Sequence, residues 1–180
     1  MKISTTLCAP VACVIGVASQ SCTDCGSSIT PLFRMFSVNT VDHFYTNGAL
    51  EVIAAATDDD YELEGVASGV FPSQQGCSVQ FLRLNNPTVF DHFYTINTTE
   101  AAIFEQNGYT LEGNAGFINA SPNCSSVTVP LLRFFNPTAV DHFYTTNEEE
   151  GQAFTSQGYV SQGIAGYVPV PGVIVNQDLC

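Results

Sequence analysis

The sequence predicts a mainly β fold with short helices, built from three β-β-α-β units around a pseudo-threefold axis. The first observation is a pentapeptide, DHFYT, which occurs at Asp42 to Thr46, Asp91 to Thr95 and Asp141 to Thr145. The second is the spacing, since the copies begin 49 and then 50 residues apart. The third is size: a unit of this length cannot bury its own apolar face, so the three must share one core. We expect a three-bladed, propeller-like closure, with a β-trefoil as the alternative.

The first half of each unit has the pattern of a β-hairpin. An apolar and aromatic run that contains one arginine, such as LLRFF in the third unit, indicates a strand. Asn-Pro-Thr follows it in the second and third copies and is a turn signal. The pentapeptide DHFYT then alternates polar and aromatic residues and predicts the second strand.

The second half of each unit predicts a short helix and a further strand. Asn97 and Asn147 have the pattern of N-caps with a Glu three residues on, and Gly108 and Gly158 are placed to end the helices. The segment Tyr-x-x-x-Gly-x-x-Gly predicts either a third strand alone or a third and a fourth, with glycines at bends or bulges. The first copy differs, because an acidic run at residues 58–60 replaces the glycine; we interpret that run as a solvated turn rather than a calcium loop.

The chain is expected to be one domain behind a secretory signal. Residues 1–19 combine Lys2, a short apolar run and small residues before a cleavage position near Ser19. Residues 20–180 form the threefold-repeat domain, with units at about 30–78, 79–128 and 129–170 and a closing tail at 171–180. The apolar run is too short for a transmembrane anchor, so no membrane insertion is expected after cleavage.

The charge balance excludes some partners. The chain has 17 Asp and Glu against 4 Lys and Arg. Nucleic-acid binding relies on basic residues, and an anionic membrane would repel this chain. Its low charge implies a surface rich in uncharged polar residues, which suits secretion and uncharged partners such as glycans.

The cysteines of the mature chain predict disulfides in an oxidising compartment. One connectivity among several pairs the head of the chain with its tail, through Cys180 and either Cys22 or Cys25, and joins Cys77 to Cys124. The number is odd, so one thiol is left over for self-association. The candidates are Cys22, Cys25, Cys77, Cys124 and Cys180.

The residues that repeat with the units have two main interpretations. In the framework interpretation, the Arg and Asp of each unit form an ion pair across the hairpin, and His accepts or donates one buried hydrogen bond. In the binding interpretation, each unit or junction offers His, Arg and a Tyr ring to a sugar. The candidate ligand-binding residues are His43, His92, His142, Arg34, Arg83, Arg133, Tyr45, Tyr94 and Tyr144, and the ion-pair candidates are Asp42, Asp91 and Asp141.

Catalytic and metal chemistry are weaker interpretations. Three histidines on the axis could form a metal site, but spacing alone does not orient them, so no metal or other cofactor is expected. There is no G-x-S-x-G motif, and triplicated carboxylates are unlike a single active site. Asn97, Asn119 and Asn123 begin N-x-S/T sequons and are glycosylation candidates.

The pattern L-x-R-x-x-N-P-T-x-x-D-H-F-Y-T, followed by a short helix and G-Y-x-x-x-G-x-x-G-Y, resembles a repeat family of unknown function. Its repeats occur in secreted fungal proteins and beside hydrolase domains of bacterial cell walls. The resemblance implies a non-catalytic module that binds a glycan or a wall surface. A structural extracellular protein or filament and a small secreted hydrolase are the alternatives.

Overall fold

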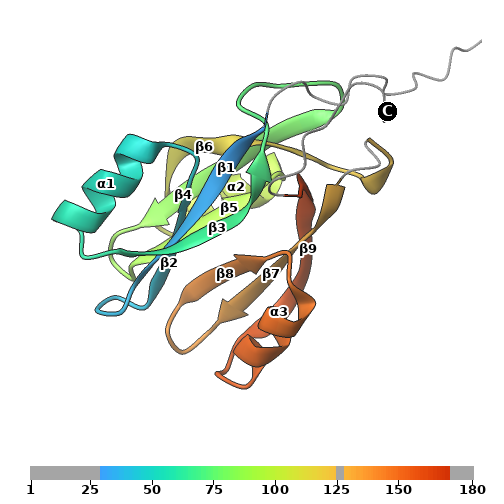
Figure 1. Cartoon of the computed structure of the whole chain (residues 1–180). Coiled ribbons are helices and arrows are strands. Elements are labelled where there is room, and N and C mark those ends of the chain that lie inside the picture. Colours follow the sequence, from blue (N-terminus) through green and yellow to red (C-terminus); the bar gives the residue numbers. More distant parts are fainter. Residues whose placement is uncertain (1–28, 125–127, 171–180) are drawn as a thin grey trace, which may run out of the picture.

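The computed structural model describes residues 29–124 and 128–170, and it is mainly β with three short helices (Figure 1). It contains three successive β-β-α-β units, as the repeat predicts. The first unit comprises β1 (Thr30–Ser37), β2 (Asp42–Thr46), α1 (Ala49–Asp58) and β3 (Glu62–Val70). The second comprises β4 (Ser78–Asn86), β5 (Asp91–Thr95), α2 (Thr98–Gln106) and β6 (Thr110–Asn119), followed by the 3-10 turn η1 (Pro122–Cys124). The third comprises β7 (Thr128–Asn136), β8 (Asp141–Thr145), α3 (Glu148–Thr155) and β9 (Val160–Pro169).

Each unit folds into a three-stranded antiparallel sheet whose first strand lies in the middle, as in the order β2-β1-β3. The second and third units join into one curled six-stranded sheet, β5-β4-β6-β9-β7-β8, through the pair Asn119 and Tyr167. The predicted hairpins are therefore present in all three units. The segment after each helix forms one strand rather than two.

Glycines occupy the irregular positions of the third strands. Gly65, Gly113 and Gly163 each face the arginine of the first strand beside a register shift, and all three have positive φ. Glycine reaches that region without the clash that a Cβ would cause. The bulges predicted from the glycine spacing are thus confirmed.

The helix ends follow the predicted signals. The side chain of Asn97 accepts hydrogen bonds from the N–H groups of Thr99 and Glu100, and Asn147 caps α3 in the same way. Glu100 does not complete a capping box, because its carboxylate turns to Thr95 and to Arg133 of the next unit. In the first unit, Asp60 takes the left-handed conformation (φ 58°) where the other units place a glycine.

The core has one shared part and three local parts. The shared cluster joins residues of all three units, with the buried tyrosines of the three DHFYT segments at its centre. Each unit adds a smaller cluster between its own helix and sheet, around Phe44, Phe93 and Phe134 with Phe143, respectively. The units therefore depend on one another for the burial of their apolar side chains.

Several predictions fall outside the described residues: the signal at 1–19, the tail at 171–180, and Cys22, Cys25 and Cys180. Cys77 lies within the described residues and is not a free thiol. The pairing of the cysteines stays a prediction. In the described ranges, no helix has the length and apolar character needed to cross a membrane.

Candidate functional site

The tyrosines of the three DHFYT segments form a closed ring of hydrogen bonds. The hydroxyl of Tyr94 accepts from the N–H of Tyr45 and donates to its carbonyl, at 2.7 and 2.8 Å. Tyr45 binds the backbone of Tyr144 in this way, and Tyr144 binds that of Tyr94. The rings pack edge to face, with centroids 5.4–5.5 Å apart. All three side chains are fully buried, so they lie out of reach of a ligand in this structure.

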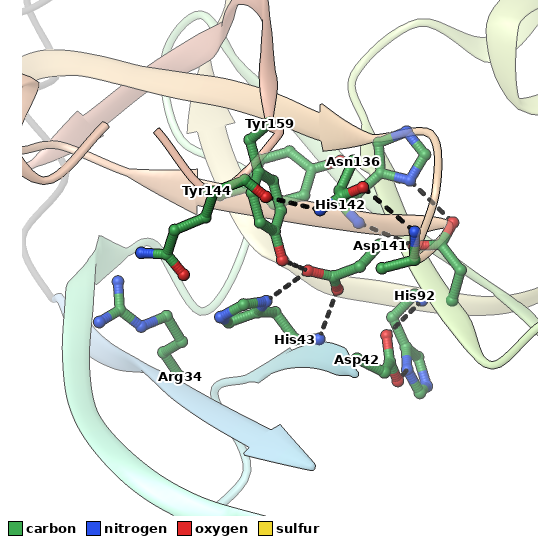
Figure 2. A network of polar contacts seen from close by, with 12 residues as sticks. Arg34, Asp42, His43, His92, Asn136, Asp141, His142, Tyr144 and Tyr159 are labelled. Atoms are coloured by element: carbon green, nitrogen blue, oxygen red, sulfur yellow. Dashed lines mark hydrogen bonds and ion pairs between the residues drawn. The ribbon is translucent and has the colours of Figure 1, made fainter. Parts of the chain in front are cut away.

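Aspartate and histidine also pair from one unit to the next, as Figure 2 shows for His43 and Asp141. The backbone N–H of His43 donates to Asp141 at 2.8 Å, and its ring Nδ1 lies 2.7 Å from the other carboxylate oxygen. The pairs His92 with Asp42 and His142 with Asp91 repeat this geometry. A tyrosine hydroxyl donates to each carboxylate as well, namely Tyr159, Tyr61 and Tyr109, respectively.

Arginine and glutamate form a third contact between units. Arg83 of β4 donates two hydrogen bonds to Glu51 of α1, at 2.8 and 2.9 Å, and its guanidinium lies over the ring of Phe44. Arg34 with Glu150 and Arg133 with Glu100 repeat the arrangement. Burial by itself raises the pKa of Glu51, but hydrogen bonds from Arg83 and Thr46 outweigh it and hold that pKa below its usual value.

The expected ion pairs between Asp and Arg of one unit are wrong. The aspartates bind histidines of the following unit, and the arginines bind glutamates of the preceding one. The register explains the difference: Arg34 faces Tyr45, whereas Asp42 faces Ser37, three positions along the strand. The residues that Asp and Arg do reach belong to the neighbouring unit, whose position a search within one repeat does not reveal.

Two of the three histidines are enclosed by aromatic rings. His43 lies between Phe36 of its own unit and Phe143 and Phe154 of the third, at centroid distances of 4.6, 5.0 and 5.6 Å. His142 has the equivalent neighbours Phe135, Phe93 and Phe104. The side chains of His43 and His142 are each 3% exposed. Neither imidazole is available to a ligand in this structure.

His92, at the junction of the first and second units, lacks two of these covering rings. The position that pairs with the histidine in the sheet is Phe36 or Phe135 in the other units but Asn85 here. The second ring is missing from the helix. In the other units, the carbonyl of Phe104 or Phe154 accepts a hydrogen bond from the N–H of the tyrosine after the helix, and Ala55 takes that position here. Phe104 and Phe154 stack on Phe93 and Phe143 with ring centroids 3.6 and 3.8 Å apart, and in the described part of the chain no ring stacks on Phe44 in this way. His92 is accordingly 12% exposed.

A cavity of about 490 Å³ lies at this junction. The apolar part of its lining comes from Phe44, Ala54 and Ala55 of the first unit and from Pro87 and Phe90 of the turn between β4 and β5. The other lining residues are Thr40, Asp42, Glu51, Asp59, Tyr61, Arg83, Asn85, His92 and Glu112. A space with apolar walls and a few converging polar groups is the usual form of a small-molecule site.

The residues that could form a metal site are aspartates, and not the three histidines that the sequence suggests. Within residues 29–124 and 128–170, the group that could hold an ion is Asp42, Asp91 and Asp141, with ligand atoms within 4.8 Å of one another. Each of these carboxylates already accepts hydrogen bonds from the backbone N–H of a histidine and from a tyrosine hydroxyl. The ring Nδ1 of the same histidine also lies within hydrogen-bond distance of it. These contacts account for the cluster as part of the framework.

The sequons lie in different environments. Asn97 is the N-cap of α2, Asn119 is buried near the end of β6, and Asn123 is exposed in the short 3-10 turn. Asn97 and Asn123 are both exposed, but the side chain of Asn97 is engaged in capping α2. Asn123 is therefore the sequon best placed to carry a glycan.

Comparison with known proteins gives one match. A family model described as "Domain of unknown function (DUF5648)" matches residues 18–169. The chain belongs to the DUF5648 family. No curated protein and no solved structure matches it. The assignment of a site in this DUF5648 chain therefore depends on its own geometry.

The sequence interpretation missed the features that set this site apart. It selected His92 and Arg83 of the DUF5648 chain, but with all their repeats and with the buried tyrosines. It did not select Asn85, Ala55 or the helix glutamates. Alignment of the three copies on the pentapeptide DHFYT would have shown both substitutions. Phe104 and Phe154 lie thirteen residues after the motif aspartate, where the first unit has Ala55. Phe36 and Phe135 lie six residues before it, where the second unit has Asn85.

Proposed function

We propose that this DUF5648 chain is a secreted, non-catalytic module that binds carbohydrate, and that the ligand enters the cavity between the first and second units. The observation that carries the proposal is the loss of two covering aromatic rings at this junction, through Ala55 and Asn85, where the other junctions are filled. In a repeat protein, packing residues recur with the unit. A departure at two positions that face the same space is therefore informative.

The chemistry of the cavity suits a sugar. Its volume falls within the range of small-molecule sites. Phe90, 52% exposed at the rim, offers an aromatic face to the C–H groups of a sugar ring. The amide of Asn85, the imidazole of His92 and the carboxylate of Glu112 converge on the cavity and can bind hydroxyl groups.

We propose one site rather than three equivalent ones. The equivalent space in the other two junctions is taken by the rings of Phe104 and Phe154, and His142 and His43 beneath them are buried. Of the residues selected from the sequence, His92 and Arg83 are kept as ligand-binding candidates. The remaining histidines, arginines and tyrosines serve the framework in this proposal.

The arrangement of the strands favours the propeller-like closure over the trefoil, because each unit folds into an antiparallel sheet of its own, as a propeller blade does. Each kind of contact, Tyr to Tyr, His to Asp and Arg to Glu, runs from every unit to the preceding one, including from the first to the third. We propose that the units form a three-bladed ring with the short DHFYT strands around its axis. Secretion rests on the signal pattern of residues 1–19.

Glu51 does not suit the role of general acid in a hydrolase at this cavity. A glycosidase needs one carboxyl that stays protonated to donate to the leaving group. Glu51 is held in the ionised form, since the bonds from Arg83 and Thr46 outweigh its burial.

The test is binding of the mature chain to a panel of oligosaccharides, compared with the substitutions Ala55→Phe and Asn85→Phe. Both variants place in the first junction the residue that already fills the others, so the fold is expected to survive, and circular dichroism and thermal unfolding would verify this. We expect saturable binding by the native chain and at least tenfold weaker binding by either folded variant. Binding that persists when both rings are restored would place the ligand elsewhere.

A further inference from the structure

We infer that the ligand of this cavity is cationic, namely an amino sugar with a free ammonium group. The inference rests on the proposed function and narrows it to one class of sugar. Four carboxylates line the cavity, from Asp42, Glu51, Asp59 and Glu112, against the two basic side chains Arg83 and His92. Even with the imidazole protonated, the lining keeps a net negative charge.

The carboxylates differ in how far they are neutralised. Arg83 lies between two of them, bound to Glu51 through its terminal nitrogens and to Glu112 through Nε at 2.8 Å. One guanidinium therefore serves two carboxylates. Glu112 is also 3.9 Å from the outer nitrogen of His92 and accepts from Asn85 at 3.3 Å. It stands at the edge of the cavity with part of its charge uncompensated.

Asp59 adds a charge in a place where helices disfavour it. It is the C-cap of α1, and no basic residue lies in the last turn. The C-terminal end of a helix carries partial negative charge, so an acidic side chain there is destabilising. The C-cap of α2 is the neutral Asn107. The first unit thus adds an acid to its helix end where the same unit lacks the ring that would close the cavity.

A bare metal ion would not use this combination. The apolar wall of Phe44, Ala54 and Ala55 and the exposed ring of Phe90 can contact the C–H face of a sugar. The ammonium group would then lie near Asp59 and Glu112, where Coulomb attraction and hydrogen bonds act together. An amino sugar combines the two, an apolar ring face and a positive charge on one small molecule.

The experiment measures binding of three oligosaccharides of equal length by calorimetry: β-1,4-linked glucosamine, its fully N-acetylated form and the corresponding glucose oligomer. We expect the glucosamine oligomer to bind most tightly, and its binding to weaken as salt is raised, because charge attraction is screened. We expect Asp59→Asn and Glu112→Gln each to weaken it by about fivefold, as expected for one charge in a hydrated site.

The chain supplies its own controls. Asparagine stands at the C-cap of α2, and Gln162 precedes the bulge glycine of β9 as Glu112 precedes that of β6, so both substitutions copy residues that the fold accepts. Glu105→Gln, at an exposed position of α2, removes the same charge from a residue that does not line the cavity, and it is expected to change little.

Each other outcome decides between the two proposals. Equal binding of the three oligomers would overturn the cationic ligand and leave the carbohydrate site in place. Binding of the glucosamine oligomer that Ala55→Phe does not weaken, or that Glu105→Gln weakens equally, would show general attraction to an acidic surface and overturn the inference. No binding of any oligomer would overturn both proposals.

Discussion

The hydroxyl of Tyr94 forms hydrogen bonds with both backbone polar groups of Tyr45, accepting from the N–H at 2.7 Å and donating to the carbonyl at 2.8 Å. Tyr45 lies on β2, an edge strand beside whose outer side the structure describes no further strand. An unpaired buried N–H or C=O costs free energy, so an edge that faces the core needs another partner. The tyrosines supply it, and the cycle of three closes the centre of the molecule without a continuous sheet.

Tyr94→Phe is predicted to destabilise the fold through this ring. It leaves the N–H and C=O of Tyr45 buried without a partner, and each such group costs about 1–3 kcal/mol. We expect the free energy of unfolding in urea to fall by about 2–6 kcal/mol. Tyr167→Phe is the control, because that hydroxyl makes no hydrogen bond to the described part of the chain. An equal loss in the two variants would contradict the role of the ring.

The units and their elements could be predicted from the sequence, because repetition, caps and turn glycines are local signals. The partners of the repeated side chains could not. Which units contact each other is a property of the tertiary structure. The sequence therefore pairs Asp42 with the arginine of its own hairpin, whereas in the structure Asp42 contacts His92 of the next unit. The burial of the motif tyrosines could not be predicted either, because alternation along a strand predicts that one of its two faces is exposed. Tyr45 faces away from Phe44, yet both faces of β2 are covered.

Phe104→Ala is predicted to open the junction of the second and third units. Phe104 is partly buried, so its deletion should cost less than the about 3–5 kcal/mol of a fully buried aromatic ring, for which transfer and cavity terms add. Because Phe104 stacks on Phe93 and covers His142, the variant should also expose that imidazole. We expect reaction of His142 with diethyl pyrocarbonate, read by peptide mass, to rise toward that of His92. His43, at the junction left intact, is the internal control.

Acid is predicted to destabilise the protein through the glutamates between units. Bonds from Arg83, Arg133 and Arg34 outweigh burial and lower the pKa of Glu51, Glu100 and Glu150, respectively. A lowered folded pKa stabilises above the unfolded value of about 4.3, and that stability is lost as pH falls through the folded pKa. Urea unfolding at a series of pH values should show the loss below about pH 4.5. Glu100→Gln should make the dependence shallower, and an unchanged slope would contradict this origin.

Alkaline pH is predicted to act through the tyrosines. Burial raises the pKa of Tyr45, Tyr94 and Tyr144 well above the usual value, and burial with the nearby aspartates does so for Tyr61, Tyr109 and Tyr159. A raised folded pKa gives stability that is complete below the unfolded value of about 10 and is lost as pH rises beyond it. Phenolate absorbance should therefore appear together with loss of circular dichroism. Gradual ionisation of most tyrosines in a protein that stays folded would contradict the burial of these hydroxyls.

Each unit packs a helix residue against a residue of its central strand, and in the third unit the sizes of the two compensate. The strand residue is Met35, Leu84 or Phe134, and the helix residue that follows the glutamate is Val52, Ala101 or Gly151. In the third unit the pair is at its limit, because a Cβ on Gly151 would overlap the ring of Phe134. The largest strand residue thus faces the smallest helix residue.

Gly151→Val is therefore predicted to destabilise the third unit, by about 1–3 kcal/mol for an overpacked core. Phe134→Met alone should also destabilise, by removing part of a buried ring. The double variant reproduces the Met and Val of the first unit, so we expect it to be more stable than the sum of the single changes predicts. A double-mutant cycle by urea unfolding should give a coupling free energy of about 1 kcal/mol or more. Simple additivity would mean that the helix shifts to relieve the overlap and that the two positions do not set each other's size.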